Sequence, residues 1–345
     1  MMNYKLFRTF AFRMERQRIE YIDAMRGFTM ILVVYSHICS FCLGDAQMGY
    51  NGVLFLFRLP CFFFISGWLF AGSEDRPFGQ VVRRKLMVQI VPTFIFLLLL
   101  APPPLFFSRL GATKGGYWFT FALFEFFVLY LLTMRLGRRW SALLAVVISI
   151  SAFCYDIYYS RFVTAHVLSL PLTRVLGFLS FMTWRYYLFF FIGTWVRSHF
   201  DTFLKWTARP VVIALIALGF LSVAVSPHPE EAVPAYLVFA CGGIMGMILV
   251  FTFFRLCSSA FTKERIAGRI LQYVGTRTLD IYLLHYFFLP RFLLSWGEQL
   301  RGLHSPLLEV ASACTLSLAV VACCLAASYI LRLSPFLAHY LFGVK

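Results

Sequence analysis

Long apolar stretches account for most of this chain and restrict what it can fold into. A helix needs about 17 to 25 consecutive apolar residues to cross the hydrocarbon core of a bilayer. Stretches of this kind lie near residues 22–43, 52–72, 83–107, 117–135, 140–156, 183–200, 209–226, 232–256, 270–295 and 306–332. Because backbone groups in lipid must hydrogen-bond within the chain, the sequence predicts an all-α, polytopic membrane helical bundle of about ten transmembrane helices.

The composition agrees with a bilayer as the solvent. Hydrophobic residues make up 61% of the 345 and charged residues only 13%, against roughly 25% charged in soluble domains. Polar residues in the second and ninth stretches, and the prolines at 102–104 in the third, favour a break or a tilt in one or more of these helices. Cys39 and Cys42 have a C-x-x-C spacing but no second Cys or His pair, so no metal site is expected.

Basic residues are distributed unevenly between the two sides of the predicted bundle. With the N-terminus inside, the cytoplasmic segments hold 21 Lys and Arg residues and the opposite loops only six. These six are Arg109, Lys114, Arg161, Arg174, Arg291 and Arg301. Cytoplasmic loops of membrane proteins are rich in Lys and Arg, so both termini are predicted to be cytoplasmic. The same rule explains the net charge of +16. Because the basic residues are accounted for by the orientation of the chain in the membrane, no nucleic-acid partner is expected.

The domain organisation predicted from the sequence is simple. Residues 1–21 form a cytoplasmic, basic, amphipathic segment that is expected to lie on the inner leaflet. Residues 22–345 form a single transmembrane domain. The longest connection on the far side, residues 157–182, is apolar enough to fold back onto the bundle.

The first apolar helix carries its polar residues on one face. Asp23, Arg26, Met30, Val33 and His37 are spaced by three or four residues and therefore form one stripe. The separation of eleven positions between Arg26 and His37 corresponds to roughly 16 Å along the helix axis. Arg26 is thus expected near the inner surface and His37 in the outer half of the membrane.

This stripe suits a long donor molecule whose anionic end stays at the cytoplasm. The phosphates of an acyl-coenzyme A need a cation, such as the guanidinium of Arg26, that binds oxyanions in a fixed geometry. The pantetheine arm is comparable in length with the spacing, so the thioester would lie beside His37. The alternatives are that Arg26 extends to lipid headgroups and that His37 is a buried histidine bonded to a neighbouring helix.

Four motifs in order along the chain resemble those of the acyltransferase-3 family of membrane acyltransferases. They are RIEYIDAMRGFTMILVVYSH (18–37), FRLPCFFFISGWLF (57–70), YWFTFALF (117–124) and LQYVGTRTLDIYLLHYF (271–287). The first contains a basic residue followed, after ten residues, by a histidine, which is a hallmark of that family. The C-terminal end, SPFLAHYLFGVK, is similar to that of members without an appended soluble domain.

The resemblance implies transfer of an acyl group from a cytoplasmic donor to an acceptor reached from the other face. It makes His37 the expected catalytic residue and Arg26 a donor-binding residue. Members also tend to carry a spaced basic pair near the start of the third helix. Arg84 and Lys85 are carried over as phosphate contacts, although Val88 or Gln89 stands where the second cation is expected, and the alternative is that both are cytoplasmic anchors.

Counting residues from the helix ends places four ionisable groups at one depth. His37 and His285 each lie about fifteen residues from the inner end of their helices, and Arg58 and Glu125 about six and eight from the outer end. Ionisable groups inside a membrane are costly and mark functional sites. His37 is therefore predicted to be the general base for a hydroxyl, His285 a second catalytic histidine, and Glu125 an orienting or acceptor-binding carboxylate. Arg58 would stabilise an oxyanion or bind an acidic acceptor.

Structural interpretations of the same residues remain open. Arg58 and Glu125 could instead form an ion pair with each other, and His285 could bond a helix backbone. Arg277 and Asp280 are three residues apart in the ninth stretch, which favours an intrahelical ion pair without a catalytic role.

The sequence therefore predicts an enzyme, an acyl-CoA-dependent O-acyltransferase. Its donor would be acetyl-CoA or another short acyl-CoA, and no metal is expected. The resemblance implies that the acceptor is a cell-surface glycan or a lipid-linked sugar. Membrane lipids and a possible second copy of the chain are the other expected partners, and the resemblance implies the cytoplasmic membrane of a bacterium. The alternative is a secondary transporter that exports a sugar precursor, since bundles with buried charges are also typical of carriers.

Overall fold

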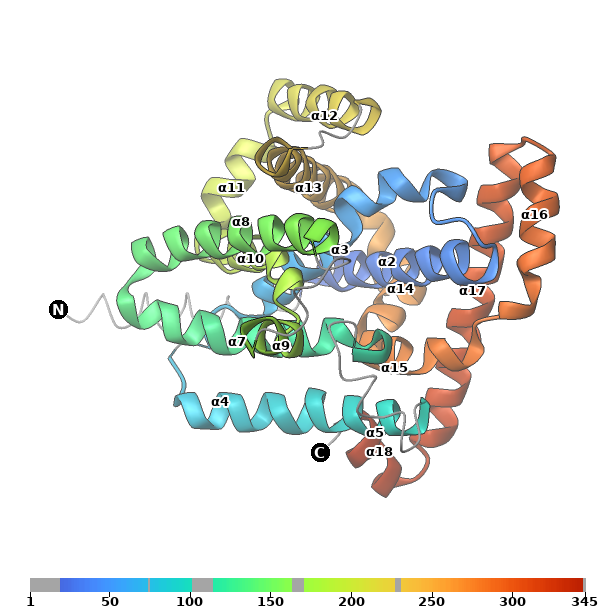
Figure 1. Cartoon of the computed structure of the whole chain (residues 1–345), viewed down its shortest axis with the longest axis horizontal. Coiled ribbons are helices and arrows are strands. Elements are labelled where there is room, and N and C mark those ends of the chain that lie inside the picture. Colours follow the sequence, from blue (N-terminus) through green and yellow to red (C-terminus); the bar gives the residue numbers. More distant parts are fainter. Residues whose placement is uncertain (1–18, 74, 101–113, 163–170, 227–230, 344–345) are drawn as a thin grey trace.

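The structure is a computed structural model that describes residues 19–73, 75–100, 114–162, 171–226 and 231–343. In these ranges the chain forms helices and short connections, with no strand. Helix α2 (Glu20–His37) runs through the middle of the molecule, and helices from distant parts of the sequence surround it (Figure 1). The predicted all-α bundle is confirmed for the described residues.

Helices make up most of the described residues, and they follow one another in this order. The first half contains α2 with a π-helical turn (Ile38–Cys42), α3 (Asn51–Phe70), α4 (Phe78–Lys85), a π-helical turn (Leu86–Ile90), α5 (Val91–Leu100), α7 (Trp118–Thr133) and α8 (Arg138–Phe162). The second half contains α9 (Pro171–Phe178), a 3-10 segment (Phe181–Tyr186), α10 (Tyr187–Ser198), α11 (Phe200–Thr207), α12 (Pro210–Val225), α13 (Ala232–Leu256), α14 (Ile266–Thr276), α15 (Thr278–Phe288), α16 (Leu294–Gly302), α17 (Pro306–Leu331) and α18 (Pro335–Phe342).

Six helices in the described residues are long and apolar enough to cross a membrane. They are Glu20–Cys42, Met48–Phe70, Trp118–Leu136, Arg138–Ile157, Val233–Leu256 and Pro306–Leu331. Helices α11 and α12 add a seventh if they are one span, although they are bent by 81°. The chain is therefore a multi-pass helical protein, while the count of ten and the side on which the termini lie stay predictions.

The ninth predicted stretch is broken, as its polar residues suggested. Helix α14 ends at Thr276, and α15 begins at Thr278 after Arg277 leaves the helical conformation. The third stretch begins five residues earlier than predicted and stays helical from Phe78 to Leu100. Its predicted end at residues 101–107, with the three prolines, lies outside the described residues, as do residues 1–18 of the predicted amphipathic segment.

The connection predicted to fold back onto the bundle contains structure of its own. Helix α8 extends to Phe162, and α9 and the 3-10 segment follow the undescribed residues 163–170. The Lys114 ammonium donates to the carbonyl of Phe178, and the Ser149 hydroxyl donates to the carbonyl of Arg185 at 2.5 Å. The first bond holds the end of α9 against the turn before α7, and the second holds the 3-10 segment against α8.

Glycines allow α2 to lie very close to α14. A Cβ on Gly27 would stand 2.0 Å from the Leu271 carbonyl oxygen, and one on Gly275 would stand 2.0 Å from that of Asp23. Helices in membranes associate closely where small residues face each other. Since α15 follows α14 directly, this contact also fixes where His285 lies relative to His37.

Candidate active site

Two histidines from distant parts of the sequence meet at the C-terminal end of α2. His37 is the last residue of α2, and His285 lies in the last turn of α15. Nδ1 of His37 is 2.7 Å from Nε2 of His285, and the two rings stack with centroids 4.8 Å apart. His285 is fully buried, whereas His37 is partly exposed to a cavity. The equal depth predicted for these residues thus corresponds to direct contact.

The backbone of α15 determines which ring nitrogens carry protons. Nδ1 of His285 lies 2.7 Å from the Tyr282 carbonyl oxygen and 3.2 Å from that of Ile281. Because a carbonyl only accepts, Nδ1 of His285 carries the proton, and Nε2 of a neutral ring is an acceptor. Nδ1 of His37 must then donate to it. The remaining nitrogen of His37, Nε2, keeps a free lone pair, which is the state that a general base requires.

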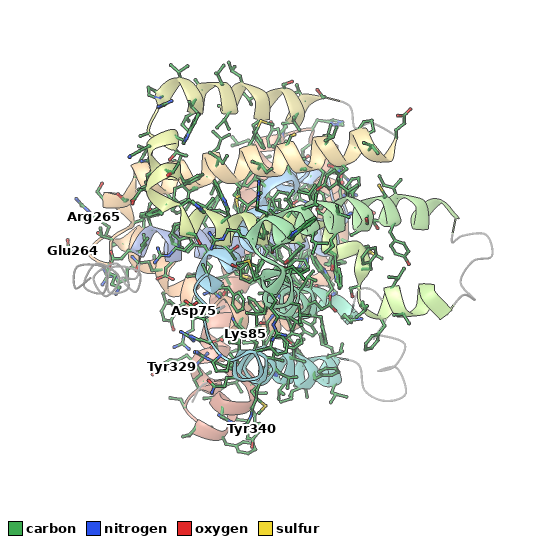
Figure 2. All side chains as sticks on the ribbon, turned by 90° about the vertical axis from the view of Figure 1, so that its left-hand side faces the viewer. Asp75, Lys85, Glu264, Arg265, Tyr329 and Tyr340 are labelled. Atoms are coloured by element: carbon green, nitrogen blue, oxygen red, sulfur yellow. The ribbon has the colours of Figure 1, made fainter. Side chains whose placement is uncertain are left out.

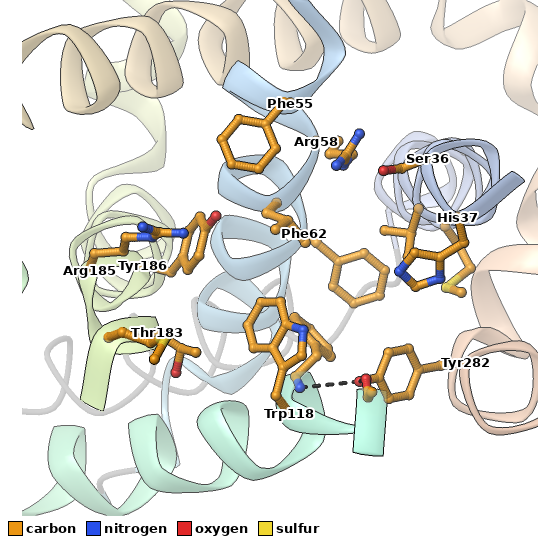
Figure 3. Close-up of a pocket in the computed structure, with 16 residues that line it drawn as sticks. Ser36, His37, Phe55, Arg58, Phe62, Trp118, Thr183, Arg185, Tyr186 and Tyr282 are labelled. Carbon is orange, nitrogen blue, oxygen red and sulfur yellow. Dashed lines mark hydrogen bonds between the residues drawn. The ribbon is translucent and has the colours of Figure 1, made fainter. Parts of the chain in front are cut away.

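His37 lines a cavity of about 290 Å³, here called the outer cavity. Figure 3 shows Ser36 and His37 of α2 on one side, Phe55 and Phe62 of α3 in the middle, and the 3-10 segment on the other side. The outer cavity also has Arg58, Trp118, Thr183, Arg185, Tyr186 and Tyr282 in its wall. It combines aromatic faces with two cations and a base.

The two arginines of the outer cavity are held differently. The Arg58 guanidinium donates from Nη1 to Asn51 Oδ1 at 2.5 Å and lies over the Phe55 ring. Arg185 forms an ion pair with Asp156 and packs against aromatic rings. Arg58 is bonded to a neutral amide, so its positive charge remains available to an anionic oxygen in the cavity.

A second cavity, of about 220 Å³ and here called the inner cavity, lies toward the other end of α2. Arg26 and Lys85 both line it, together with Gln89, Thr120 and Thr278. The Lys85 ammonium lies 3.8 Å from the centre of the Phe127 ring, on the side of α4 that faces the bundle (Figure 2). Arg84, by contrast, is exposed and does not line the inner cavity.

Three side chains belong to the walls of both cavities. Phe62, Phe119 and Tyr282 line the outer and the inner cavity. Phe62 and Phe119 meet edge to face at 4.8 Å, and Phe119 and Tyr282 at 5.5 Å. The two cavities therefore lie on opposite sides of one aromatic partition, with Arg26 at one end and His37 at the other.

Hydrogen bonds fix this partition to the start of α7. The Tyr282 hydroxyl accepts from the Phe119 backbone N–H at 3.1 Å and donates to the Gly116 carbonyl at 3.0 Å. The Tyr286 hydroxyl donates to the same carbonyl at 3.1 Å. Gly116 has φ +100°, and a Cβ there would stand 2.6 Å from the Tyr286 ring, so this turn requires glycine.

Glu125 takes a different place from the one predicted. Its Oε2 accepts from Trp184 Nε1 at 2.7 Å, and Glu125 lines neither cavity. No ion pair joins it to Arg58 among the described residues, so the alternative of an Arg58–Glu125 pair is wrong. Residue counting gives depth but not the direction in which a side chain leaves its helix, and the two side chains point to different neighbours.

Asp280 has more partners than the sequence indicated. The predicted contact with Arg277 exists at 3.7 Å, but Arg332, which directly follows α17, binds both carboxylate oxygens of Asp280 at 2.8–2.9 Å. The Ser328 hydroxyl donates to the same carboxylate at 2.5 Å. Asp280 therefore ties α15 to α17, a role that agrees with the structural interpretation of this residue.

The profile of an acyltransferase domain matches residues 19–329, which is nearly the whole chain. The chain belongs to the acyltransferase-3 family. No curated protein and no solved structure matches it. As a member of the acyltransferase-3 family with several membrane-length helices, it is a multi-pass membrane acyltransferase.

The structure adds four residues to the candidate site that sequence reasoning passed over. Asn51, Phe62, Phe119 and Tyr282 all contact site residues or form the partition. They are neutral or apolar, so nothing in a search for buried charges marks them. The sequence did mark Arg185, because it is an arginine at the edge of a predicted span. Its ion pair with Asp156 could not be predicted, because the two residues belong to different helical segments.

Proposed function

We propose that the enzyme transfers an acyl group, with acetyl as the favoured case, from cytoplasmic acyl-CoA to a hydroxyl of a glycan or lipid-linked sugar. The donor would place its phosphates at Arg26 and Lys85 in the inner cavity and its thioester beside His37 in the outer cavity. The observation that carries this proposal is the arrangement of the two cavities, with cations at one end, a histidine pair at the other and a thin aromatic partition between them.

The reaction follows from the proton positions in the histidine pair. His37 Nε2 takes the proton of the acceptor hydroxyl as its oxygen attacks the thioester carbonyl carbon. A new C–O bond forms, the C–S bond breaks, and the proton on His37 passes to the departing CoA sulfur. His285 does not touch the substrate and acts as a positioning residue, because its Nε2 accepts from His37 Nδ1–H and stabilises the imidazolium that forms.

Arg58 and the aromatic wall supply the remaining interactions. The guanidinium of Arg58 stabilises the oxyanion of the tetrahedral intermediate or binds an acidic group of the acceptor. Trp118 lines the outer cavity, is partly exposed and offers an aromatic ring on which a sugar can stack. Glu125 acts indirectly, since its bond to Trp184 holds the 3-10 segment that contributes Thr183 to the outer cavity.

The test is an acyl-transfer assay with purified protein, radiolabelled acetyl-CoA and a crude glycan acceptor. His37→Ala should lower the transfer rate by about 10²–10⁴-fold, the usual contribution of a general base. Arg26→Ala should weaken CoA binding by roughly 10- to 100-fold, the value of one charge-assisted hydrogen bond. Arg84→Ala serves as the matched control, because Arg84 is a nearby cation that does not line the inner cavity.

Undiminished transfer by His37→Ala would overturn the proposed mechanism. CoA binding that is equal in Arg26→Ala and Arg84→Ala would remove the donor site from the inner cavity. Vesicles that accumulate a sugar precursor without forming any acylated product would favour the transporter instead.

A further inference from the structure

One residue that lines the inner cavity, Thr278, has a buried hydroxyl that lacks a partner. Thr278 is 2% exposed, and its Oγ1 makes no hydrogen bond within the protein. The other threonine of this wall, Thr120, is satisfied by the Tyr117 carbonyl at 2.9 Å. An unpaired buried polar group is costly, and native proteins satisfy nearly all of them. Because Thr278 also lines a cavity, a ligand bound there can supply the missing partner.

Thr278 also stands where the backbone has free donors. It is the first residue of α15, which begins at the break after α14, and no side chain caps this end. The first amides of a helix have no partner within the helix and carry a partial positive charge. Thr278 and Leu279, from this first turn, both line the inner cavity. A hydroxyl and a helix N-terminus therefore share a wall with Arg26 and Lys85.

We infer that Thr278 and the first turn of α15 form a binding site for an oxygen acceptor of the donor molecule. This inference rests on the proposed function, which places acyl-CoA in the inner cavity, and it adds a neutral contact to the two cations. The oxygen belongs either to the CoA phosphates or to an amide carbonyl of the pantetheine arm. Both are hydrogen-bond acceptors that a threonine hydroxyl and free amides can serve.

The chain contains a matched control for this residue. Thr252 of α13 is also 2% exposed, and its Oγ1 is also without a hydrogen bond, but it lines neither cavity. Thr→Val keeps the shape of the side chain and removes the hydroxyl. Since neither hydroxyl is bonded in the free protein, neither Thr278→Val nor Thr252→Val should lower the melting temperature of the free protein.

The experiment is calorimetric titration of wild type, Thr278→Val and Thr252→Val with CoA, ADP and pantetheine. Thr278→Val should weaken CoA binding by about tenfold, the value of one hydrogen bond to a charged or buried acceptor, whereas Thr252→Val should match the wild type. A parallel loss with ADP assigns the oxygen to the phosphates, and a parallel loss with pantetheine assigns it to the arm.

The outcomes separate this inference from the proposed function. CoA affinities that are equal in Thr278→Val and Thr252→Val, with normal binding by the wild type, would overturn the Thr278 site alone. A melting temperature of the free protein that falls in Thr278→Val but not in Thr252→Val would also overturn it, because the hydroxyl would then serve the fold. A wild type that does not bind CoA would overturn both.

Discussion

Tyr282 contributes to the candidate site twice. Its carbonyl oxygen accepts from His285 and thereby sets the proton positions in both imidazoles, while its hydroxyl connects α15 to the start of α7. In the proposed mechanism, the protonation state of the general base His37 is therefore set by a backbone carbonyl and by the neutral ring of His285. At the scale of residues, the proposed role of His37 therefore requires a hydrogen-bond acceptor for its Nδ1–H, which is Nε2 of His285. It does not require His285 to act as a second base on the substrate.

Substitution of His285 tests this dependence. His285→Leu removes the acceptor for His37 Nδ1–H and should lower kcat by about 10²-fold, within the range of general-base catalysis, with little change in the KM for acetyl-CoA. His285→Gln places an amide oxygen near the position of Nε2 and should restore part of kcat. Steady-state kinetics on the purified variants give both values. Equal kcat in the wild type and His285→Leu would contradict the positioning role.

At the scale of elements, the site depends on how α15 is fixed. Helix α14 holds it against α2 through the glycine contact, and Asp280 holds it to α17. The break at Arg277 lies between these two anchors, and Thr278 and Leu279 of the first turn of α15 line the inner cavity. The contacts that fix α15 and the proposed donor site thus belong to one segment of the chain.

Gly27→Ala should destabilise the protein by at least about 1–3 kcal/mol, the usual cost of overpacking. The added Cβ would collide with the Leu271 carbonyl, so α2 and α14 must separate. Gly79→Ala in α4 is the control, because nothing lies within 4 Å of a Cβ there, and it should be neutral or slightly stabilising. Thermal unfolding in detergent measures both, and equal melting temperatures would contradict the close packing.

Asp280→Ala should destabilise the protein by about 2–5 kcal/mol, because it leaves Arg332 without its buried anion. Arg277→Gln should have a much smaller effect, since Arg277 is more exposed and its contact with Asp280 is 3.7 Å long. The double variant Asp280→Leu with Arg332→Leu should recover part of the loss. Thermal unfolding again gives the comparison, and similar losses for Asp280→Ala and Arg277→Gln would refute the assigned partner.

At the scale of the whole molecule, two cavities share one partition. The sequence predicted the stripe from Arg26 to His37 because both residues lie on one helix, where spacing determines position. It also predicted the helices, since hydropathy is a local property. It did not predict that Glu125 faces Trp184 or that Arg332 reaches Asp280, because such contacts depend on how separate helices rotate and cross.

The central claim, that the donor and the acceptor occupy opposite ends of one path, is tested most directly by the sidedness of the reaction. The enzyme is reconstituted in sealed vesicles and sorted by orientation, with labelled acetyl-CoA on the side of Arg26 and the sugar acceptor on the side of His37. The account predicts acylated product only in this arrangement. Product that forms only when both substrates are on the same side would contradict it.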